Sequence, residues 1–423
     1  MVMSTIRVAT ITFDFYPFDP LVRRIAGAAI DGGYSVDVIC LRQPGEPRYE
    51  ICEGVHVHRL PMNRGFGRSL PVTILSWCWF LLISGIVLTR LHIQKHFDVV
   101  HIHNMPDFLV FAASIPKMLG AKVILEVQDV SPELMAAKAK GKVRKIVTRL
   151  ARWQERLSTA FADHVITVGW PFEQLLLQRG VPARKITIIL NSADPRLYPE
   201  SRRDFRETQT FDESTPLILM YHGTVASRNG LDIAIQALAL ARKVVPHVRL
   251  DIKGRGEFIP ILKQMAQELS VSDGVVFTGP CQPEELVNFV THGDIGIIPY
   301  RIDGFMELVL PTKAYEFAWM HRPMIASDTR AIRSMFRSES VVLCDDSSPE
   351  SFAEAIIDLY QHPEKRLSLA VNAAEDYQPF KWELMAERYR ALLVSLSRKE
   401  ARQEAYLHAS NRVESNKESG RRK

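Results

Sequence analysis

The sequence predicts an α/β protein with two Rossmann-like domains, each a doubly wound parallel sheet. Three observations lead to this prediction. Short runs rich in Val and Ile, typical of strands that are buried on both faces, alternate with helical stretches. The alternation stops at a polar segment, 191–215, and then restarts. The length of 423 residues also exceeds what one ordinary hydrophobic core supports.

The first half of the chain contains the first series of strands and helices. Strands are expected at 7–12, 35–40, 55–60, 98–103, 121–127, 163–168 and 185–190. Helices are expected at 20–31, 106–119 and 143–162. Gly32 and Gly33 follow the first of these helices, and glycine is the residue that most often ends a helix.

The second half repeats the pattern after the polar segment, which reads as a linker because it is proline-containing and has no apolar period. Strands are expected at 217–222, 248–253, 274–278, 294–300, 323–327 and 340–344. Helices are expected at 231–245, 258–269, 283–291, 311–320 and 349–360.

These elements place one domain at 1–195 and a second at 196–376. A helix at 377–397 is expected to pack back on the first domain. The charged tail, 398–423, has few large apolar residues and is expected to be disordered. Ligands of doubly wound sheets bind beyond the carboxyl ends of the strands. The cleft between two such domains that face each other is therefore the default site.

The composition of the chain argues against several classes of function. The chain is 47% hydrophobic and 24% charged, and its net charge of +5 is too small for a dedicated nucleic-acid binder. The five cysteines are scattered without CxxC spacing, so neither a zinc site nor a disulfide framework is expected. The N-terminus reads as a first strand rather than a signal peptide. A reducing cytoplasm is the simplest compartment.

Two glycine-rich turns follow strands in the second domain. In "YHGTVASRNG", Gly223 allows a tight turn beside Thr224, and Arg228 lies just before the next helix, where it could contact a phosphate. In "LDIKGRGEF", Gly254 and Gly256 allow a close approach of the backbone. Each turn is equally compatible with an ordinary strand–helix connection.

A third motif, "LPTKAYE", is more informative. Pro311 fits the start of a helix, where Thr312 and Lys313 offer backbone N–H groups and a cation to an anion. Glu316 lies one turn further on the same face and could accept hydrogen bonds from ribose hydroxyls. A solvent-exposed Lys/Glu pair would give the same pattern.

Polar side chains also end two strands of the first domain. His103 closes "DVVHIH", and "VILEVQD" ends in Glu126, Gln128 and Asp129. Side chains of this kind at strand ends are candidate site residues, although a hydrogen-bonded core histidine is the plainer interpretation of each His. No His/Asp/Glu spacing requires a metal here.

Two segments of the first domain suggest contact with a membrane. The segment 69–89 carries no charge and is long enough to cross a bilayer. Because the strands before and after it belong to one sheet, it is expected to lie on the membrane or in the core rather than to span. The segment 137–157 predicts a basic amphipathic helix.

Taken together, these motifs resemble the bacterial glycosyltransferase family 4-like enzymes with the GT-B fold. The resemblance covers roughly residues 5–396 and is carried by "FDPLVRRIAGAAIDGGYSVDVI", "FDVVHIHNMPDFLV", "FADHVITVGWPFEQLLLQRGVPARKITIILNSAD", "YHGTVASRNGLDIAI", "DIGIIPY" and "LPTKAYEFAWMHRPMIASD". It implies that a sugar is transferred with retention from a nucleotide diphosphate. The acceptor would bind the first domain and the donor the second, and no divalent metal would be required.

Some residues of this sequence match the family's motifs and others do not. Glu316 matches the second glutamate of the family's E-x7-E motif, whereas the first falls on Leu308, with Glu307 one residue early. The family's histidine of the "HD" pair is replaced by Gln128, which cannot act as a general base. The resemblance therefore implies catalytic roles for Glu316, Lys313, Arg228, Asp129 and His103. Donor-binding residues are expected to be Gly223, Thr224, Arg228, Gly254, Gly256, Pro311, Thr312, Lys313 and Glu316.

The expected function is a glycosyltransferase that uses a UDP- or GDP-sugar to extend a glycan or a polyprenyl-linked glycan. It would serve cell-surface polysaccharide or glycolipid biosynthesis from the inner face of the plasma membrane. The departures from the family pattern leave two alternatives. These are a pseudo-enzyme that binds a nucleotide sugar as a scaffold, and a nucleotide-sugar 2-epimerase.

Overall fold

The computed structural model describes residues 5–62, 70–138, 141–200, 211–212, 214–280 and 283–397. The predicted disordered tail, 398–423, lies outside these residues, as do residue 69 and residues 139–140 of the two predicted membrane segments. The chain forms two compact units. Unit 1 comprises Met1–Val168, Leu175–Ile189 and the chain from Met385, and unit 2 comprises Gly169–Gln174 and Leu190–Leu384.

Unit 1 is built on an eight-stranded sheet whose strand order is β3-β4-β2-β1-β5-β6-β7-β8. Its strands are β1 Arg7–Phe15, β2 Ser35–Leu41, β3 Tyr49–Cys52, β4 Val55–Leu60, β5 Val99–His103, β6 Lys122–Val127, β7 His164–Thr167 and β8 Ile186–Ile188. Strands β1, β2 and β4–β8 are parallel, and their inward positions are almost all buried, as the Val/Ile runs predict.

Strand β3 departs from the predicted all-parallel sheet, because it pairs antiparallel with β4 at the edge. Its residues Tyr49 and Ile51 are exposed, so the strand lacks the buried apolar run from which the other strands were predicted.

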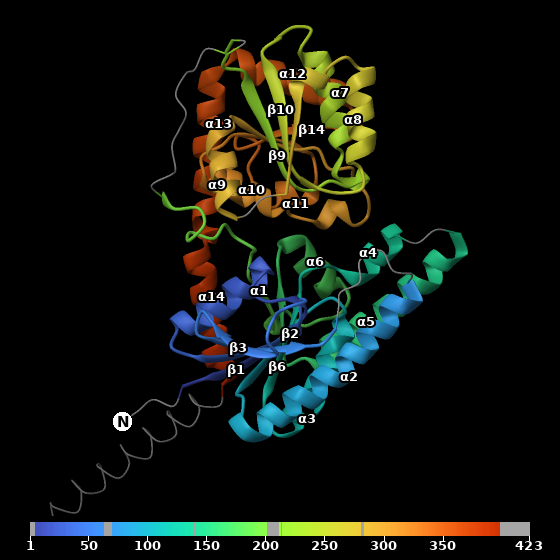
Figure 1. The fold of residues 1–423 in the computed structure, drawn as a ribbon, viewed down its shortest axis with the longest axis vertical. Helices are drawn as coiled ribbons and strands as arrows, with labels where there is room; N and C mark the ends of the chain where they lie inside the picture. The colour runs from blue at the N-terminus through green and yellow to red at the C-terminus, as the bar shows by residue number, and fades with distance from the viewer. Residues whose placement is uncertain are drawn as a thin grey trace, which may run out of the picture. The chain divides into compact units, whose positions relative to one another are not determined.

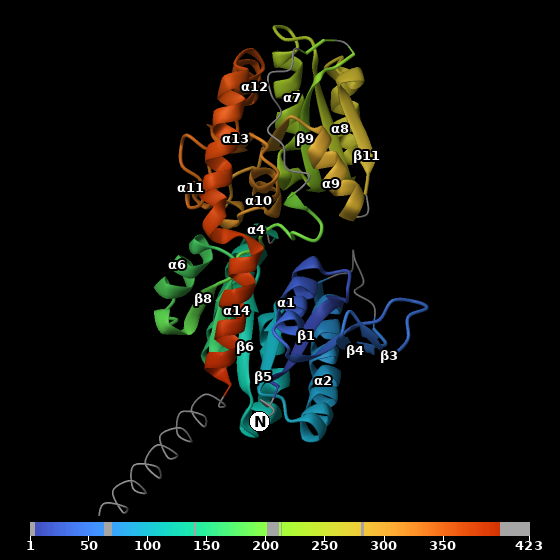
Figure 2. The ribbon, with the colours of Figure 1, turned by 90° about the vertical axis from the view of Figure 1, so that its left-hand side faces the viewer.

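Helices cover both faces of this sheet (Figure 1). They are α1 Pro20–Asp31, α2 Leu70–Lys95, the 3₁₀ helix η1 Asp107–Ala113, α3 Ser114–Met118, α4 Ser131–Lys138, α5 Gly141–Phe161, α6 Trp170–Gln178, η2 Ala183–Lys185 and α14 Trp382–Leu396; α6 belongs largely to unit 2. Figure 2 shows α14 lying along the sheet beside α1. The Tyr389 hydroxyl of α14 lies 3.0 Å from Nδ1 of His101 in β5. The C-terminal helix therefore returns to the first unit, as predicted.

Unit 2 is a six-stranded parallel sheet with the order β11-β10-β9-β12-β13-β14. Its strands are β9 Leu217–Thr224, β10 Val248–Arg255, β11 Val275–Gly279, β12 Ile295–Ile298, β13 Met324–Ser327 and β14 Val342–Cys344. Its helices are η4 Ser227–Asn229, α7 Leu231–Ala241, α8 Ile259–Glu268, η5 Ser272–Gly274, α9 Pro283–His292, η6 Met306–Leu308, α10 Thr312–Trp319, α11 Arg330–Arg333, α12 Pro349–Gln361, α13 Pro363–Tyr377 and η7 Gln378–Phe380.

The core of unit 2 lies between the sheet and helices α7, α8 and α12. It includes Leu219, Tyr221, Leu238, Ile297 and Phe352, each fully buried. Both units therefore have the doubly wound architecture that the alternating pattern predicts. The positions that matter for function are the carboxyl ends of the strands in each sheet.

Candidate functional site

The strand order of unit 2 changes direction between β9 and β12, which are neighbours in the centre of the sheet. The crevice at such a switch point is where doubly wound sheets bind ligands. Tyr221 and Gly223 belong to β9, and Tyr300 follows β12. The side chain of Lys313, from the first turn of α10, reaches these three residues.

The ammonium group of Lys313 is buried against two aromatic rings. Its Nζ lies 4.2 Å from the centroid of the Tyr221 ring and 5.0 Å from that of Tyr300, and it donates a hydrogen bond of 3.1 Å to the Tyr300 hydroxyl. The residue is only 5% exposed. Within the described part of the chain, no carboxylate forms an ion pair with it. Unit 2 therefore holds a buried positive charge that no described carboxylate pairs with.

The surroundings of Lys313 keep it charged. Burial would lower its pKa, but the phenols of Tyr221 and Tyr300 outweigh burial and raise the pKa above its ordinary value. Burial also raises the pKa of Tyr221 to about 12, against the opposing effect of Lys313. At neutral pH the site therefore presents the Lys313 cation, which suits an anionic ligand.

The start of α10 adds backbone donors beside this cation. Pro311 precedes the helix in extended conformation, so the helix begins at Thr312 rather than at Pro311 as predicted. No side chain caps this end, and Thr312 is exposed. Free N–H groups at a helix N-terminus attract negative charge, so the charge of Lys313 and the helix end act in the same direction.

Glu316 lies one turn further along α10 and faces β9. Its Oε2 atom is 3.0 Å from Nε2 of His222, the residue before Gly223. His222 is buried and packs edge-on against Phe317. His222 was not predicted as a site residue, although its position near the end of a strand and next to Gly223 would have indicated it.

The glycines of the two turns leave space for different reasons. Gly223 has φ 116°, and a Cβ there would lie 3.8 Å from Nζ of Lys313, so the missing side chain keeps the cation accessible. A Cβ on Gly254 would lie 1.8 Å from the carbonyl oxygen of Gly223, and one on Gly256 would lie 1.8 Å from that of Val225. These two glycines therefore allow the two turns to pack on each other.

The remaining predicted residues of unit 2 have other contacts. Thr224 is exposed, and its carbonyl accepts a hydrogen bond of 2.6 Å from the Tyr221 hydroxyl. Arg228 is exposed in η4, and its charge opposes the rise in the pKa of Tyr221 that burial causes. Glu307 accepts a hydrogen bond of 3.1 Å from the N–H of Arg330 at the start of α11, and Leu308 is buried.

In unit 1 the predicted residues gather at the ends of β5 and β6. His103 and Glu126 are register partners on these strands, and each is only 1% exposed. The Gln128 side chain lies 3.0 Å from Nδ1 of His103. His103 is thus enclosed, and its ring would have to move to meet a hydroxyl group of an acceptor. Gln128 and Asp129 are partly exposed.

Asn104, which the sequence analysis did not single out, organises this strand end. Its amide nitrogen donates to Asp107 at 2.8 Å and to the carbonyl of Asp129 at 2.7 Å, and its oxygen accepts from the N–H of Gln128 at 2.8 Å. The side chain thereby fixes the loop on which Asp129 lies.

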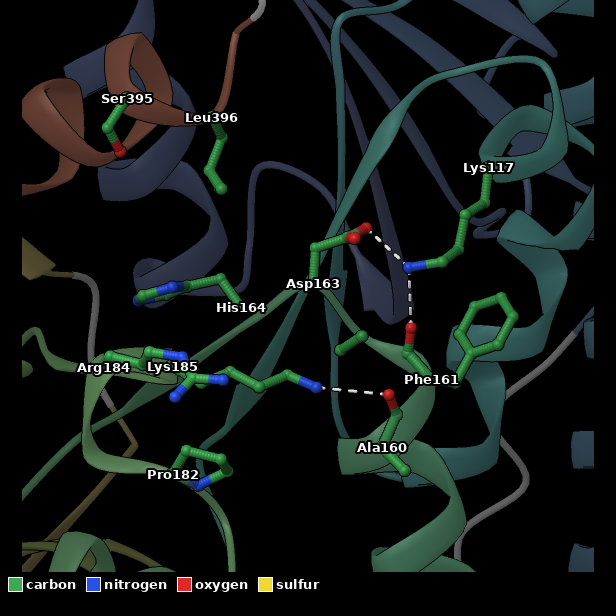
Figure 3. Close-up of a pocket in the computed structure, with 11 residues that line it drawn as sticks. Lys117, Ala160, Phe161, Asp163, His164, Pro182, Arg184, Lys185, Ser395 and Leu396 are labelled. Atoms are coloured by element: carbon green, nitrogen blue, oxygen red, sulfur yellow. Dashed lines mark hydrogen bonds and ion pairs between the residues drawn. The ribbon is translucent and has the colours of Figure 1, made fainter.

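A pocket of about 710 Å³ lies at the opposite, amino ends of strands in unit 1 (Figure 3). Its Lys117 donates to Asp163 at 2.6 Å and to the carbonyl of Phe161 at 2.8 Å, and Lys185 donates to the carbonyl of Ala160 at 3.2 Å. None of the predicted site residues lines this pocket.

Comparison with known families gives a match to each half of the chain. Residues 20–192 match the glycosyl transferase 4-like domain, and residues 216–362 match the glycosyl transferases group 1 domain. Together the two matches cover about three quarters of the sequence.

Curated relatives are distant but extend over much of the chain. A D-inositol 3-phosphate glycosyltransferase from Thermomonospora curvata is 22% identical, over 92% of this chain and 95% of its own length. An alpha-D-kanosaminyltransferase from Streptomyces kanamyceticus is 22% identical, over 61% of this chain and 66% of its own.

Solved structures agree on the fold. Sucrose-phosphate synthase from Thermosynechococcus elongatus has a TM-score of 0.72 at 18% identity and covers 93% of this chain and 99% of its own. Anabaena Alr3699/HepE in complex with UDP and glucose has a TM-score of 0.67 at 16% identity, over 92% of this chain and all of its own. At such identities the likeness concerns the fold alone.

Proposed function

Because the chain belongs to the glycosyltransferases of the GT-B type, we propose that it transfers a sugar with retention from a UDP- or GDP-sugar to a lipid-linked glycan. The single observation that carries the donor assignment is the buried charge of Lys313 at the switch point of unit 2, which has no carboxylate partner in the described residues. A diphosphate is the anion that such a site and an uncapped helix end would accommodate.

The same geometry suggests how the donor is held. Lys313 and the N–H groups at the start of α10 would contact the diphosphate, with Arg228 as a further cation nearby. Glu316 would accept hydrogen bonds from the ribose hydroxyls, and His222 would hold its carboxylate in place. The leaving diphosphate would thus be stabilised by fixed positive groups and helix N–H groups, without a divalent metal at the donor.

Retention follows if the acceptor attacks from the face that the diphosphate leaves. The bond between the sugar's anomeric carbon and the phosphate oxygen breaks, and the acceptor oxygen bonds to that carbon on the same side. The acceptor's proton passes to the departing phosphate oxygen. Asp129 could assist as a base from unit 1, whereas Gln128 cannot and His103 is enclosed.

A lipid-linked acceptor is supported by the outer surface of α5. Its exposed apolar residues follow helical spacing along one stripe: Ile146, Leu150, Trp153 and Leu157 are 62%, 59%, 64% and 40% exposed. The side buried against unit 1 carries Ala151, Glu155 and Ser158 instead. A helix whose large apolar residues face outward is suited to contact another apolar surface, such as a lipid bilayer.

Charged residues of α5 fit the same interpretation. Lys145, Arg149, Arg152 and Arg156 are exposed, and by helical spacing they lie along one edge of the apolar stripe. Cations in this position would meet anionic lipid headgroups when the stripe enters a membrane.

Helix α2 extends the apolar surface. It is long and apolar enough to cross a membrane, and only 17% of that apolar window is buried. Phe80, Ser84 and Leu88 form its buried stripe, and Leu75, Trp79 and Leu82 are more than half exposed. Strands β4 and β5, on either side of α2 in the chain, lie in one sheet, so the helix would lie on the membrane rather than span it.

These features support a peripheral enzyme on the inner face of the plasma membrane that acts in cell-surface polysaccharide or glycolipid biosynthesis. The test is to incubate the purified protein with labelled UDP- or GDP-sugars and extracted membrane lipids. Labelled lipid is the expected product. An epimerised donor would instead identify an epimerase, and donor binding without turnover would identify a scaffold; either result would overturn the proposal.

A further inference from the structure

Three buried side chains of unit 1 converge on one point without completing hydrogen bonds to each other. Oε2 of Glu126 lies 2.9 Å from Nε2 of His101 and 3.3 Å from Nδ1 of His103. All three side chains are at most 1% exposed. Yet neither Oε2 of Glu126 nor Nε2 of His101 has a hydrogen-bond partner among the described residues.

The fold produces this cluster from two neighbouring strands. His101 and His103 are two residues apart in β5, so both point to the same face of the sheet, and their rings stack with centroids 4.4 Å apart. Glu126 is the register partner of His103 in β6. The ligand atoms of the three residues all lie within 4.8 Å of one another.

From this geometry we propose that His101, His103 and Glu126 bind a zinc ion that ties β5 to β6. Two imidazoles and one carboxylate form a ligand set that zinc uses in proteins. In a tetrahedral site with bonds of about 2.1 Å, neighbouring ligand atoms lie about 3.4 Å apart. The separation of 3.3 Å is close to that value, and the separation of 2.9 Å would widen when an ion binds.

The surroundings of the cluster match those of a bound metal. Metal-bound histidines commonly hydrogen-bond through their second ring nitrogen, which fixes the ring. Nδ1 of His101 lies 3.0 Å from the Tyr389 hydroxyl in α14. The Gln128 amide lies 3.0 Å from Nδ1 of His103, the nitrogen that faces Glu126, and by rotation it could present its oxygen as a fourth ligand. Nε2 of His103 has no hydrogen-bond partner among the described residues. The site is closed to solvent, so the ion would be structural rather than catalytic.

Charge also favours a cation at this point. No Lys or Arg side chain of the described residues forms an ion pair with Glu126, and the buried Arg24 acts on it only through its charge at longer range. A buried carboxylate without a cation in contact is costly, and a bound metal ion would supply that contact.

The test measures metal in the full-length protein, purified without a polyhistidine tag or chelator. We expect about one zinc ion per chain by mass spectrometry. Cells grown with Co²⁺ in place of Zn²⁺ should yield protein with the visible bands of Co²⁺ bound to nitrogen and oxygen ligands. A folded wild-type protein with less than about a tenth of an ion and no Co²⁺ bands would overturn the proposal.

Two variants locate the ion. Glu126→Gln keeps the shape of the side chain and removes its charge, so metal content should fall at least about tenfold and the unfolding temperature should fall. If the cluster were only a hydrogen-bonded network, the same change would remove a buried charge and leave the unfolding temperature equal or higher. His164→Gln changes a histidine of β7 that contacts Thr187 at 2.8 Å, outside the cluster, and should keep its metal. Equal metal in both variants would place the ion elsewhere and refute the assignment.

Discussion

Lys313 is the residue through which the proposed donor site can be tested most directly. Its ammonium is buried, charged and unpaired by any described carboxylate, so its loss removes the charge together with its contacts to Tyr221 and Tyr300. We expect Lys313→Met, which nearly preserves volume, to weaken UDP or GDP binding at least about tenfold, the scale of a lost charge-assisted contact. Calorimetric titration measures this. Lys243→Met, at an exposed position of unit 2, is the matched control and should bind normally.

Glu316 should act on a different part of the donor. If its carboxylate holds the ribose, Glu316→Gln will weaken binding of the free nucleoside and of the nucleotide alike, each by about tenfold. Lys313→Met should leave nucleoside binding unchanged, because the nucleoside has no phosphate. Competition binding with uridine, guanosine and their diphosphates separates the two effects. Loss of nucleoside binding in Lys313→Met alone would contradict the assignment of roles.

Glu155 provides a prediction about pH. Burial raises the pKa of its carboxyl from 4.5 to about 7, and the adjacent Arg179 offsets this only in part. Between these pH values the folded chain holds a proton that the unfolded chain releases. The free energy of unfolding should therefore fall as pH rises from about 4.5 to about 7. Glu155→Gln should show a shallower fall than the wild type in urea titrations across this range. Parallel curves for the two proteins would show that the Glu155 proton plays no part.

Some of these residues could be predicted from the sequence and others could not. Lys313 and Glu316 were accessible because a proline, a lysine and a glutamate at helical spacing mark the start of one helix. His222 lies in β9 and Tyr300 follows β12, and their approach to α10 depends on how helix and sheet pack. The contact of His101 and Glu126 depends on the register of β5 and β6, which no local pattern encodes.

Among the helices and strands, prediction succeeded where the sequence contains a clear apolar run or residues that mark both ends of a helix. Helix α1 was predicted with its observed bounds, since Pro20 and the two glycines mark both ends. The stretch predicted as one helix at 106–119 is instead η1 followed by α3, with Pro116 inside the latter. Helix α13 was not predicted.

Helix α5 carries the prediction about membrane contact. We expect the protein to float with vesicles that contain anionic lipid, because its stripe of Leu150 and Trp153 enters the bilayer surface. Leu150→Ser combined with Trp153→Ser should reduce the floating fraction at least about fivefold, since each large apolar side chain contributes about 1.5–3 kcal/mol on leaving water. Val244→Ser, which changes an exposed apolar residue of unit 2, is the control. Flotation of the double variant at the wild-type level would exclude α5 as the contact.

At the scale of the whole molecule, α14 joins the end of the chain to its beginning. Met385, Tyr389 and Leu393 are at most 1% exposed within unit 1. Each such side chain contributes about 1.5–3 kcal/mol, and a domain is stable by only about 5–15 kcal/mol. A chain that ends at residue 381 should therefore lose the calorimetric unfolding transition of unit 1. A chain that ends at residue 397 should keep it, and equal stability of the two chains would contradict this.

The outward apolar stripe of α5 and the exposed side of α2 also affect how the protein behaves in the laboratory. In a lipid-free buffer both surfaces would face water, and apolar surfaces of this extent tend to find each other. Particle sizes measured in such a buffer would then report association through these apolar surfaces rather than a biological assembly. Mild detergent should return the protein to its true size, so its oligomeric state is best measured with detergent or nanodiscs present.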